Sequence, residues 1–530
     1  MVSLPPNLPF TSQPRTNPEP TQNVQTRDVQ YPKEKFVTTS TSFNAAIPID
    51  AASAKERQPA ALPMLFLTEM WERFSYYGMR ALLVIYLVNS QGYDRSNALA
   101  LYATYTGLVY LSPLMGGYLA DRYLGKRKAI LVGGFTMALG HFAMAFPAFL
   151  HLALGLLIIG NGFFKPNIGS LLGSLYREND PRRDGGFTFF YMGVNTGAFL
   201  APLIAGTLGE KVGWHYGFGA AGVGMCLGLL QFVLGQKKLG TAGFIGDKTS
   251  LDRRDWLHIL LISFGMVPLV LSILSVWSVI GPVWNGFSFL VKIAIIIGII
   301  GALWFSNKPK ENVEKLTSEE WQRISAIFIM GFFVVFFWMG FEQAGGTMSL
   351  FADKQTDRHI AGWEVPTSYF QAINPLGIVI FGPIMAYIWT RNAQSRMALP
   401  TPVKMALGMI ILGLGFIVMA IAQAKADVAG TVGPQWLVFV YLLHTLGELC
   451  LSPVGLSMVT KLAPARVGAL MLGVWYLANA AANTLAGLLE ELLKGSSFPV
   501  FGFLVLSSIG AGIVLLMITP LLKKLMHGKA

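Results

Sequence analysis

Long runs of hydrophobic residues alternate along this chain with short polar and basic segments. Most runs contain about 20 residues or more, which is the length that an α-helix needs to cross the hydrocarbon core of a bilayer. The pattern therefore predicts fourteen membrane-spanning helices. They are expected near residues 61–89, 97–120, 129–149, 152–175, 186–209, 215–236, 256–280, 284–306, 320–350, 366–390, 402–424, 435–461, 467–490 and 499–524.

The spans fall into groups of six, two and six. This grouping predicts an all-α membrane protein in which two six-helix bundles, 57–236 and 319–530, enclose a ligand site between them. Residues 237–318 would form a linker that carries the two inserted spans. Residues 1–56 are rich in Pro, Thr, Gln, Asn and Ser and contain no apolar run, so we expect a disordered cytoplasmic tail and no signal peptide.

The composition agrees with a membrane protein, because only 13% of the 530 residues are charged, against about 25% in soluble domains. The net charge of +12 is concentrated in alternate loops. Examples of these loop residues are Arg122, Lys126, Arg127, Lys128, Arg182, Arg183, Lys237, Lys238, Lys308, Lys310, Arg391, Arg396, Lys523 and Lys524. This positive-inside pattern places those loops and both termini in the cytoplasm of a multi-pass protein of the cell inner membrane, and it argues against nucleic-acid binding.

Other site types find little support in the sequence. Cys226 and Cys450 lie in apolar runs, so neither a disulfide framework nor a cofactor is expected. His444 and Glu448 are four residues apart, but no third ligand is near, so no metal is expected. Residues 217–222 match G-x-G-x-x-G inside an apolar span, where close helix packing explains the glycines better than a dinucleotide. No Ser, His and Asp lie in register for catalysis, so an enzyme is the least favoured class.

The first span carries ionisable residues that lipid would not tolerate. Glu69, Glu72, Arg73 and Arg80 would each cost about 2.5–3.5 kcal/mol near the bilayer centre. Glu69, Arg73, Tyr77 and Arg80 follow one another at helical spacing, so they form one stripe. We therefore expect this face of the helix to point into the protein interior and to belong to a transport pathway.

Further charges are embedded in later spans. Lys165 lies far from both ends of its span and needs a carboxylate, for which the acids of the first span are candidates; a purely structural ion pair is the alternative. Glu342 could pair with Arg80 across the two bundles, and such a pair could act as a gate that depends on protonation.

Opposite charges on the two bundles suggest the chemistry of the ligand. The N-terminal bundle offers Arg73 and Lys165, and the C-terminal bundle offers Glu448 with Ser452 on the same helix face. A zwitterion with a carboxylate at one end and an ammonium at the other would fit between them. The expected polar and aromatic walls consist of Tyr77, Tyr110, Asn195, Asn374, Trp338 and Trp475.

Several motifs resemble those of a known family. The loop at 117–127 resembles the Gly-x-x-x-Asp-Arg-x-x-Gly-x-Arg loop of the major facilitator superfamily; a generic basic loop is the alternative, and the position of the loop after the second span favours the superfamily. Three further motifs look like signatures of the proton-dependent oligopeptide transporter (POT or PTR) family, bacterial branch, over about residues 60–524. They are Glu69-x-x-Glu72-Arg73-Phe74-x-Tyr76-Tyr77, Phe190-Tyr191-x-x-x-Asn195-x-Gly197 and Gly447-Glu448-Leu449-x-x-Ser452-Pro453-x-Gly455.

The resemblance implies roles for individual residues. Glu69, Glu72, Arg73, Lys165 and Glu342 would couple transport to protons, and Arg80 with Glu342 would form an outer gate. The implied peptide site consists of Arg73, Tyr76, Tyr77, Tyr110, Lys165, Asn195, Trp338, Asn374, Glu448, Ser452 and Trp475. In animal members a His follows the Tyr of the second span, whereas Ala103 follows Tyr102 here, so the carboxylates would have to carry the coupling.

The resulting hypothesis is a monomeric symporter in the lipid bilayer that imports di- and tripeptides with protons by alternating access. A major facilitator that carries another substrate, such as a nitrate-like anion or a drug, is the first alternative. The full Glu-x-x-Glu-Arg pattern favours peptides, because members that carry anions typically lack it. A membrane sensor that binds peptides without moving them is the second alternative.

Overall fold

The structure is a computed structural model. It describes residues 57–528 except 178–179, 181, 246–247, 249, 287–315, 394–397, 465–466 and 495–497, so the predicted tail at 1–56 and most of the predicted span at 284–306 lie outside it. The N-terminal helices are α1 (Leu62–Asn89), α2 (Arg95–Leu119), α3 (Lys126–Met144), α4 (Leu150–Gly173), α5 (Arg183–Ala201) and α6 (Trp214–Gly235). Short π-helical turns continue two of them, namely η2 (Ala120–Leu124) after α2, and η4 (Pro202–Gly206) with η5 (Leu208–Val212) after α5.

The second half of the chain follows a longer inserted helix, α7 (Arg253–Gly286), which continues beyond the predicted end of that span near residue 280. The C-terminal helices are α9 (Ser318–Phe341), α10 (Thr347–Lys354), α11 (Ile373–Ala393), α12 (Thr401–Ala429), α13 (Gln435–Leu462), α14 (Gly468–Leu492) and α15 (Val500–Leu525). Two 3-10 helices join them, η7 (Glu342–Gly345) after α9 and η8 (Thr367–Ala372) before α11. A capping box of Thr317 and Glu320 starts α9 and explains why the helix begins at this point after the linker.

Two features of this half differ from the predicted pattern. The span expected at 320–350 is broken, because Gly346 has φ −116° and ψ −108° and separates η7 from α10. A β-hairpin of β1 (His359–Ile360) and β2 (Trp363–Glu364) follows, so the chain is not purely helical. Its two-residue turn has positive φ at Ala361 and Gly362, which is the geometry that suits the twist of paired strands.

The helices are suited to lipid. Among the described residues, ten helical segments are long and apolar enough to cross a bilayer. The first helix is equally long but is not one of the ten, and its four embedded charges explain this. Large apolar side chains such as Leu234, Leu506 and Met517 are more than 60% exposed, as expected of helices whose outer faces contact acyl chains.

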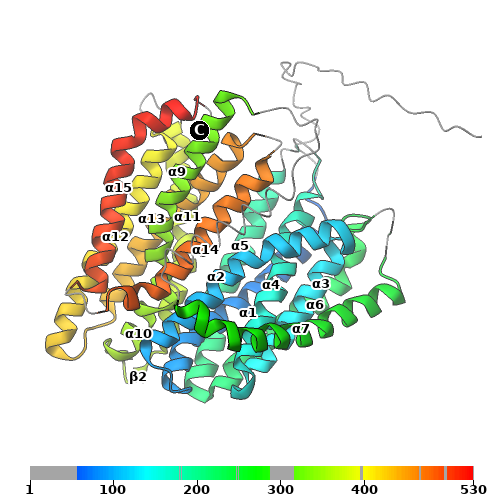
Figure 1. Cartoon of the computed structure of the whole chain (residues 1–530), viewed down its shortest axis with the longest axis horizontal. Helices are drawn as coiled ribbons and strands as arrows, with labels where there is room; N and C mark the ends of the chain where they lie inside the picture. The colour runs from blue at the N-terminus through cyan, green and yellow to red at the C-terminus, as the bar shows by residue number, and fades with distance from the viewer. Residues whose placement is uncertain are drawn as a thin grey trace, which may run out of the picture. The chain divides into compact units, whose positions relative to one another are not determined.

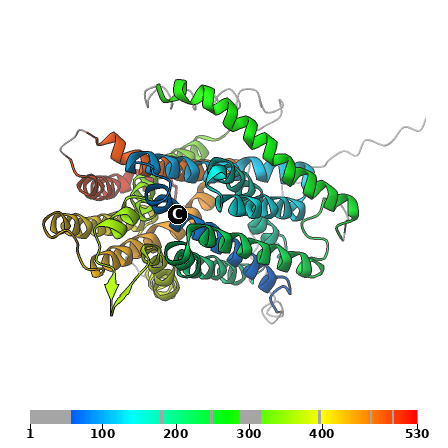
Figure 2. The same ribbon diagram turned by 90° about the horizontal axis from the view of Figure 1, so that it is seen from below.

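Two hydrophobic cores hold the helices together. One core is built mainly from α1–α4 and α6, and the other from α9–α15. The two sets meet where α2 packs on α14 and α5 on α11, and they diverge toward the end at which the C-terminus is marked (Figure 1). Gly487 contacts Ala103 and Leu99 at the α2–α14 contact, where a side chain would not fit. The inserted α7 lies outside, against α3 and α4, as the view from below also shows (Figure 2).

Candidate functional site

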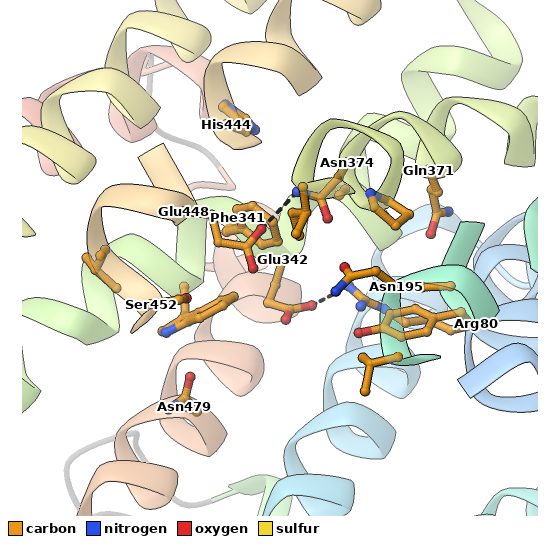
Figure 3. A pocket seen from close by; sticks show the side chains of 18 of the residues that line it. Arg80, Asn195, Phe341, Glu342, Gln371, Asn374, His444, Glu448, Ser452 and Asn479 are labelled. Carbon is orange, nitrogen blue, oxygen red and sulfur yellow. Dashed lines mark hydrogen bonds and ion pairs between the residues drawn. The ribbon is translucent and has the colours of Figure 1, made fainter. Parts of the chain in front are cut away.

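A cavity of about 350 Å³ lies between the two sets of helices. This size is suitable for a small ligand. Eleven of the fifteen residues predicted for the site line it, namely Tyr77, Arg80, Tyr110, Lys165, Asn195, Trp338, Glu342, Asn374, Glu448, Ser452 and Trp475. These residues come from both bundles, and the labelled side chains of Arg80, Glu342 and Glu448 point toward one space (Figure 3).

The other four predicted residues, Glu69, Glu72, Arg73 and Tyr76, are buried on α1 without lining the cavity. Arg73 contacts Glu72 through Nε and donates from Nη2 to Glu72 Oε1 over 2.7 Å. Its Nε also lies 3.2 Å from Glu69 Oε1, as the four-residue spacing predicts. Both carboxylates therefore neutralise the same guanidinium within one helix.

The two acids are not equivalent in this network. Glu72 is fully buried and receives a third contact, because Asn161 Nδ2 lies 3.3 Å from Glu72 Oε1. Glu69 Oε2 is buried and has no hydrogen-bond partner in the described part of the chain. A buried, unsatisfied carboxylate oxygen is energetically costly, and a proton on this group would lower the cost.

Lys165 is placed differently from the prediction. Its Nζ lies 4.6 Å from the centre of the Tyr110 ring, a cation–π contact at the cavity wall. Within the described residues it forms no ion pair with the acids of α1, since Arg73 occupies both of them. The ammonium therefore stays available at the cavity surface.

Arg80 links the two bundles beside the cavity. Its Nη2 pairs with Glu342 Oε2, as predicted, and both side chains are at least nine-tenths buried. Its Nε donates to Tyr102 Oη over 2.7 Å, and the guanidinium lies 5.7 Å from the centre of the Tyr77 ring. The ion pair between Arg80 and Glu342 that the sequence predicted is thus formed in this conformation.

Glu448 lies on the opposite wall. Asn374 Nδ2 donates to Glu448 Oε2 over 2.8 Å and lies 3.1 Å from Thr445 Oγ1 (Figure 3). Gly447 allows α13 to approach α12, because a Cβ there would lie 2.7 Å from the main-chain oxygen of Gly408. Since a carboxylate accepts about four hydrogen bonds, Glu448 retains capacity for a cationic ligand group.

Some residues that line the cavity were not predicted from the sequence. Tyr191 and Asn479 line the cavity, as do Gln371, Tyr441 and His444. Tyr191 belongs to a quoted motif, and Asn479 follows Trp475 by one helical turn, so helical spacing could have found both. Gln371 lies in η8, near the start of the span predicted at 366–390, and no motif in the sequence marked it as a lining residue.

Further polar contacts join the bundles toward the ends of α2 and α14. Arg95 Nε lies 2.6 Å from Glu490 Oε2, and Ser96 Oγ donates to Glu491 Oε2 over 2.6 Å. These contacts lie at the end opposite to the basic loops. They join the two bundles on that side of the molecule.

Comparisons with known proteins cover most of this chain. Residues 127–503 match the family model described as POT family. The chain is 40% identical over 491 residues to the uncharacterized transporter YclF of Bacillus subtilis (strain 168), covering 89% of this chain and 95% of that protein. It is 34% identical over 494 residues to the peptide transporter YePEPT of Yersinia enterocolitica, covering 88% of this chain and 95% of that protein.

Solved structures give the same result. A peptide transporter POT in complex with sulfate is similar with a TM-score of 0.74 and 38% identity, over 89% of this chain and 96% of that one. A POT family transporter in complex with 5-aminolevulinic acid is similar with a TM-score of 0.73 and 32% identity, over 88% of this chain and 97% of that one. These similarities extend over both sets of helices.

Proposed function

The chain belongs to the POT family, and from this membership we propose that it is a proton-coupled symporter that imports di- and tripeptides by alternating access. It is a multi-pass membrane transporter with the all-α fold of the major facilitator superfamily. A relative in Lactococcus lactis, 34% identical, is named a di-/tripeptide transporter. We assign it to the cell inner membrane with both termini in the cytoplasm, because the basic loops cluster at one end.

One observation carries the substrate assignment, namely the opposite charges on the two walls of the cavity. Lys165 on α4 would bind the peptide carboxylate, and Glu448 on α13 would bind its amino group. Glu448 takes its hydrogen bond from the neutral amide of Asn374, which leaves its charge to the ligand. The related transporter that holds 5-aminolevulinic acid supports this assignment, since that molecule also has an amino group at one end and a carboxylate at the other.

The same geometry suggests how protons enter the cycle. A proton on Glu342 would remove its charge and release Arg80, which is the contact that joins the bundles beside the cavity. The pair of Glu69 and Glu72 around Arg73 offers a second site, with the unpartnered oxygen of Glu69 as its acceptor. The peptide would then bridge the two walls, and both solutes would leave on the cytoplasmic side.

The available driving force is sufficient for accumulation. A potential of about 100 mV contributes about 2.3 kcal/mol for each charge. A pH difference of one unit adds about 1.4 kcal/mol. One net proton could therefore support a peptide gradient of several hundred-fold. We propose that the transporter acts as a monomer, and light scattering of the detergent-purified protein tests this.

The test is uptake of labelled dialanine into proteoliposomes, with and without an inward proton gradient and a negative interior. We expect accumulation only with the gradient. Glu448→Gln should weaken peptide binding at least tenfold, because it removes the charge that faces the amino group. Glu72→Gln should retain peptide exchange while it loses accumulation driven by protons.

A matched control is Asp427→Asn on α12. Asp427 is an exposed acid outside the cavity that accepts hydrogen bonds from Gln423 and Gln355. This variant should accumulate dialanine like the wild type. If the wild-type protein binds peptides but never accumulates them, a sensor is indicated, and if it moves nitrate and ignores dialanine, the substrate assignment is wrong.

A further inference from the structure

A carboxylate at the end of the α5 segment reaches across to the other bundle. Glu210 in η5 accepts the main-chain N–H of Thr367 through Oε2 over 2.6 Å. Its Oε1 accepts the main-chain N–H of Ser368 over 2.9 Å. Both N–H groups begin a continuous helical segment, Thr367–Asn392, which contributes Asn374 to the cavity. The first N–H groups of a helix have no acceptor within that helix. Glu210, which belongs to the N-terminal bundle, is the acceptor for these two N–H groups of the C-terminal bundle.

The local sequence does not provide another cap. Pro366 precedes the segment and makes no side-chain hydrogen bond to it. Thr367 and Ser368 are 2% and 0% exposed, so water does not replace Glu210 in this conformation. A buried N–H without an acceptor is costly, and a charged acceptor makes a stronger hydrogen bond than a neutral one. The contact therefore stabilises the arrangement in which η5 and η8 touch.

Other contacts at this place keep the two elements in register. Thr207 Oγ1 and Tyr369 Oη lie 2.9 Å apart, and Ser368 Oγ donates to the main-chain oxygen of Pro202 over 3.3 Å. Gly206 lets Ser368 approach, since a Cβ there would overlap with the Ser368 hydroxyl. The two bundles cannot separate here without breaking these contacts together.

An ion pair beside them differs in character. Lys211 Nζ lies 2.7 Å from Glu364 Oε2, and the two side chains are 30% and 40% exposed. Exposed pairs of this kind contribute little, because water and salt screen them. Removing the Glu364 carboxylate should therefore affect the closed state much less than removing the Glu210 carboxylate nearby.

We propose that Glu210 is a gating residue that holds the outer end of the transporter closed, and that its release from Thr367 and Ser368 is a step in opening outward. The assignment of this end as the outer one, and of a cycle, rests on the proposed function. In the open state both the carboxylate and the two N–H groups would regain water. Removing the carboxylate penalises the closed state alone, so the population should shift toward the outward-open state. The shift should be at least tenfold, because tenfold is about the equilibrium change expected for the loss of one charge-assisted hydrogen bond and removal of the carboxylate loses two.

The experiment measures the distance between the outer ends of the two bundles in nanodiscs without substrate. Spin labels are attached through Tyr216→Cys on α6 and Val428→Cys on α12, which are 52% and 90% exposed. Cys226 and Cys450 are first replaced by Ser. Electron–electron double resonance then gives the ratio of short to long distances in the wild type, Glu210→Gln, Glu210→Ala and Glu364→Gln.

We expect the ratio of long to short distances to rise at least tenfold in Glu210→Ala, which loses both hydrogen bonds, and less in Glu210→Gln, whose amide oxygen can still accept one N–H. Glu364→Gln should change the ratio less than twofold. Unchanged distances in both folded Glu210 variants would overturn the proposal, and so would an equal shift in Glu364→Gln. Dialanine uptake by the same purified wild-type protein, reconstituted into proteoliposomes, tests the gating role and the peptide-transport function separately. A shifted ratio without any wild-type uptake would retain the gating role and reject peptide transport.

Discussion

The packing of α4 against α3 allows a matched pair of glycine substitutions in one helix. At Gly160 a Cβ would lie 2.7 Å from the main-chain oxygen of Gly133 and 2.8 Å from the main-chain nitrogen of Met137. At Gly169, about two and a half turns further along α4, a Cβ would meet nothing within 4 Å. The same change to Ala should therefore have opposite effects at the two positions.

The magnitudes follow from these distances. A carbon normally lies about 3.3 Å or more from a carbonyl oxygen, so Gly160→Ala leaves a deficit of about 3.3 − 2.7 = 0.6 Å against rigid main chain. Overpacking of this kind costs about 1–3 kcal/mol. Replacing Gly by Ala inside a helix stabilises the folded protein by about 0.8–1.0 kcal/mol through helix propensity, and Gly169→Ala keeps this stabilisation. The free energies of unfolding of the two variants should thus differ by roughly 1–3 kcal/mol, because both variants share the gain in helix propensity and only Gly160→Ala has the cost of overpacking.

The displacement should also reach the functional site. Asn161 follows Gly160 directly and contacts Glu72, and Lys165 lies little more than one turn further along. Gly160→Ala should consequently reduce proton-driven dialanine uptake, whereas Gly169→Ala should leave it intact.

The assay is the apparent Tm of the detergent-purified protein at one fixed scan rate, because unfolding of such proteins is commonly irreversible. The expected order is Gly169→Ala at or above the wild type, and Gly160→Ala below it. An equal or higher Tm for Gly160→Ala would refute the reasoning, since it would mean that α3 and α4 are not in main-chain contact.

Two further predictions concern the gate and the loops. Tyr102→Phe removes the oxygen that accepts Arg80 Nε at 2.7 Å, so transport by the folded variant should fall roughly tenfold in an uptake assay; unaltered uptake would show that the hydroxyl does not hold the gate. In the loop before α5, hydrogen bonds from Arg182 lower the pKa of Asp180 to about 2. A lowered pKa means that its stabilising contribution is present above the unfolded pKa near 4 and is lost only as the pH falls through about 2. Asp180→Asn should therefore leave the pH profile of uptake between pH 5 and 8 unchanged, and a displaced profile would contradict this assignment.

Helical spacing in the sequence predicted which side chains share a helix face, and in this way it identified part of the lining of the cavity. Charged groups within apolar spans must meet partners inside the protein, and the buried pair of Arg80 and Glu342 agrees with that argument. The charges of Lys165 and Glu448 were likewise correctly expected on opposite walls of one cavity. The family follows from the same motifs, and the comparisons confirm it.

The sequence by itself thus determined the apolar helices, the two bundles as a hypothesis and the stripe of charge on α1, because these depend on residues a few positions apart. Only the tertiary structure decided the partners of several other charged groups. Lys165 lies over Tyr110, Glu72 contacts Asn161, and Glu210 holds two N–H groups more than 150 residues away. Such choices depend on how closely helices approach one another. That distance is set by small residues scattered over many helices, and no local period in the sequence records it.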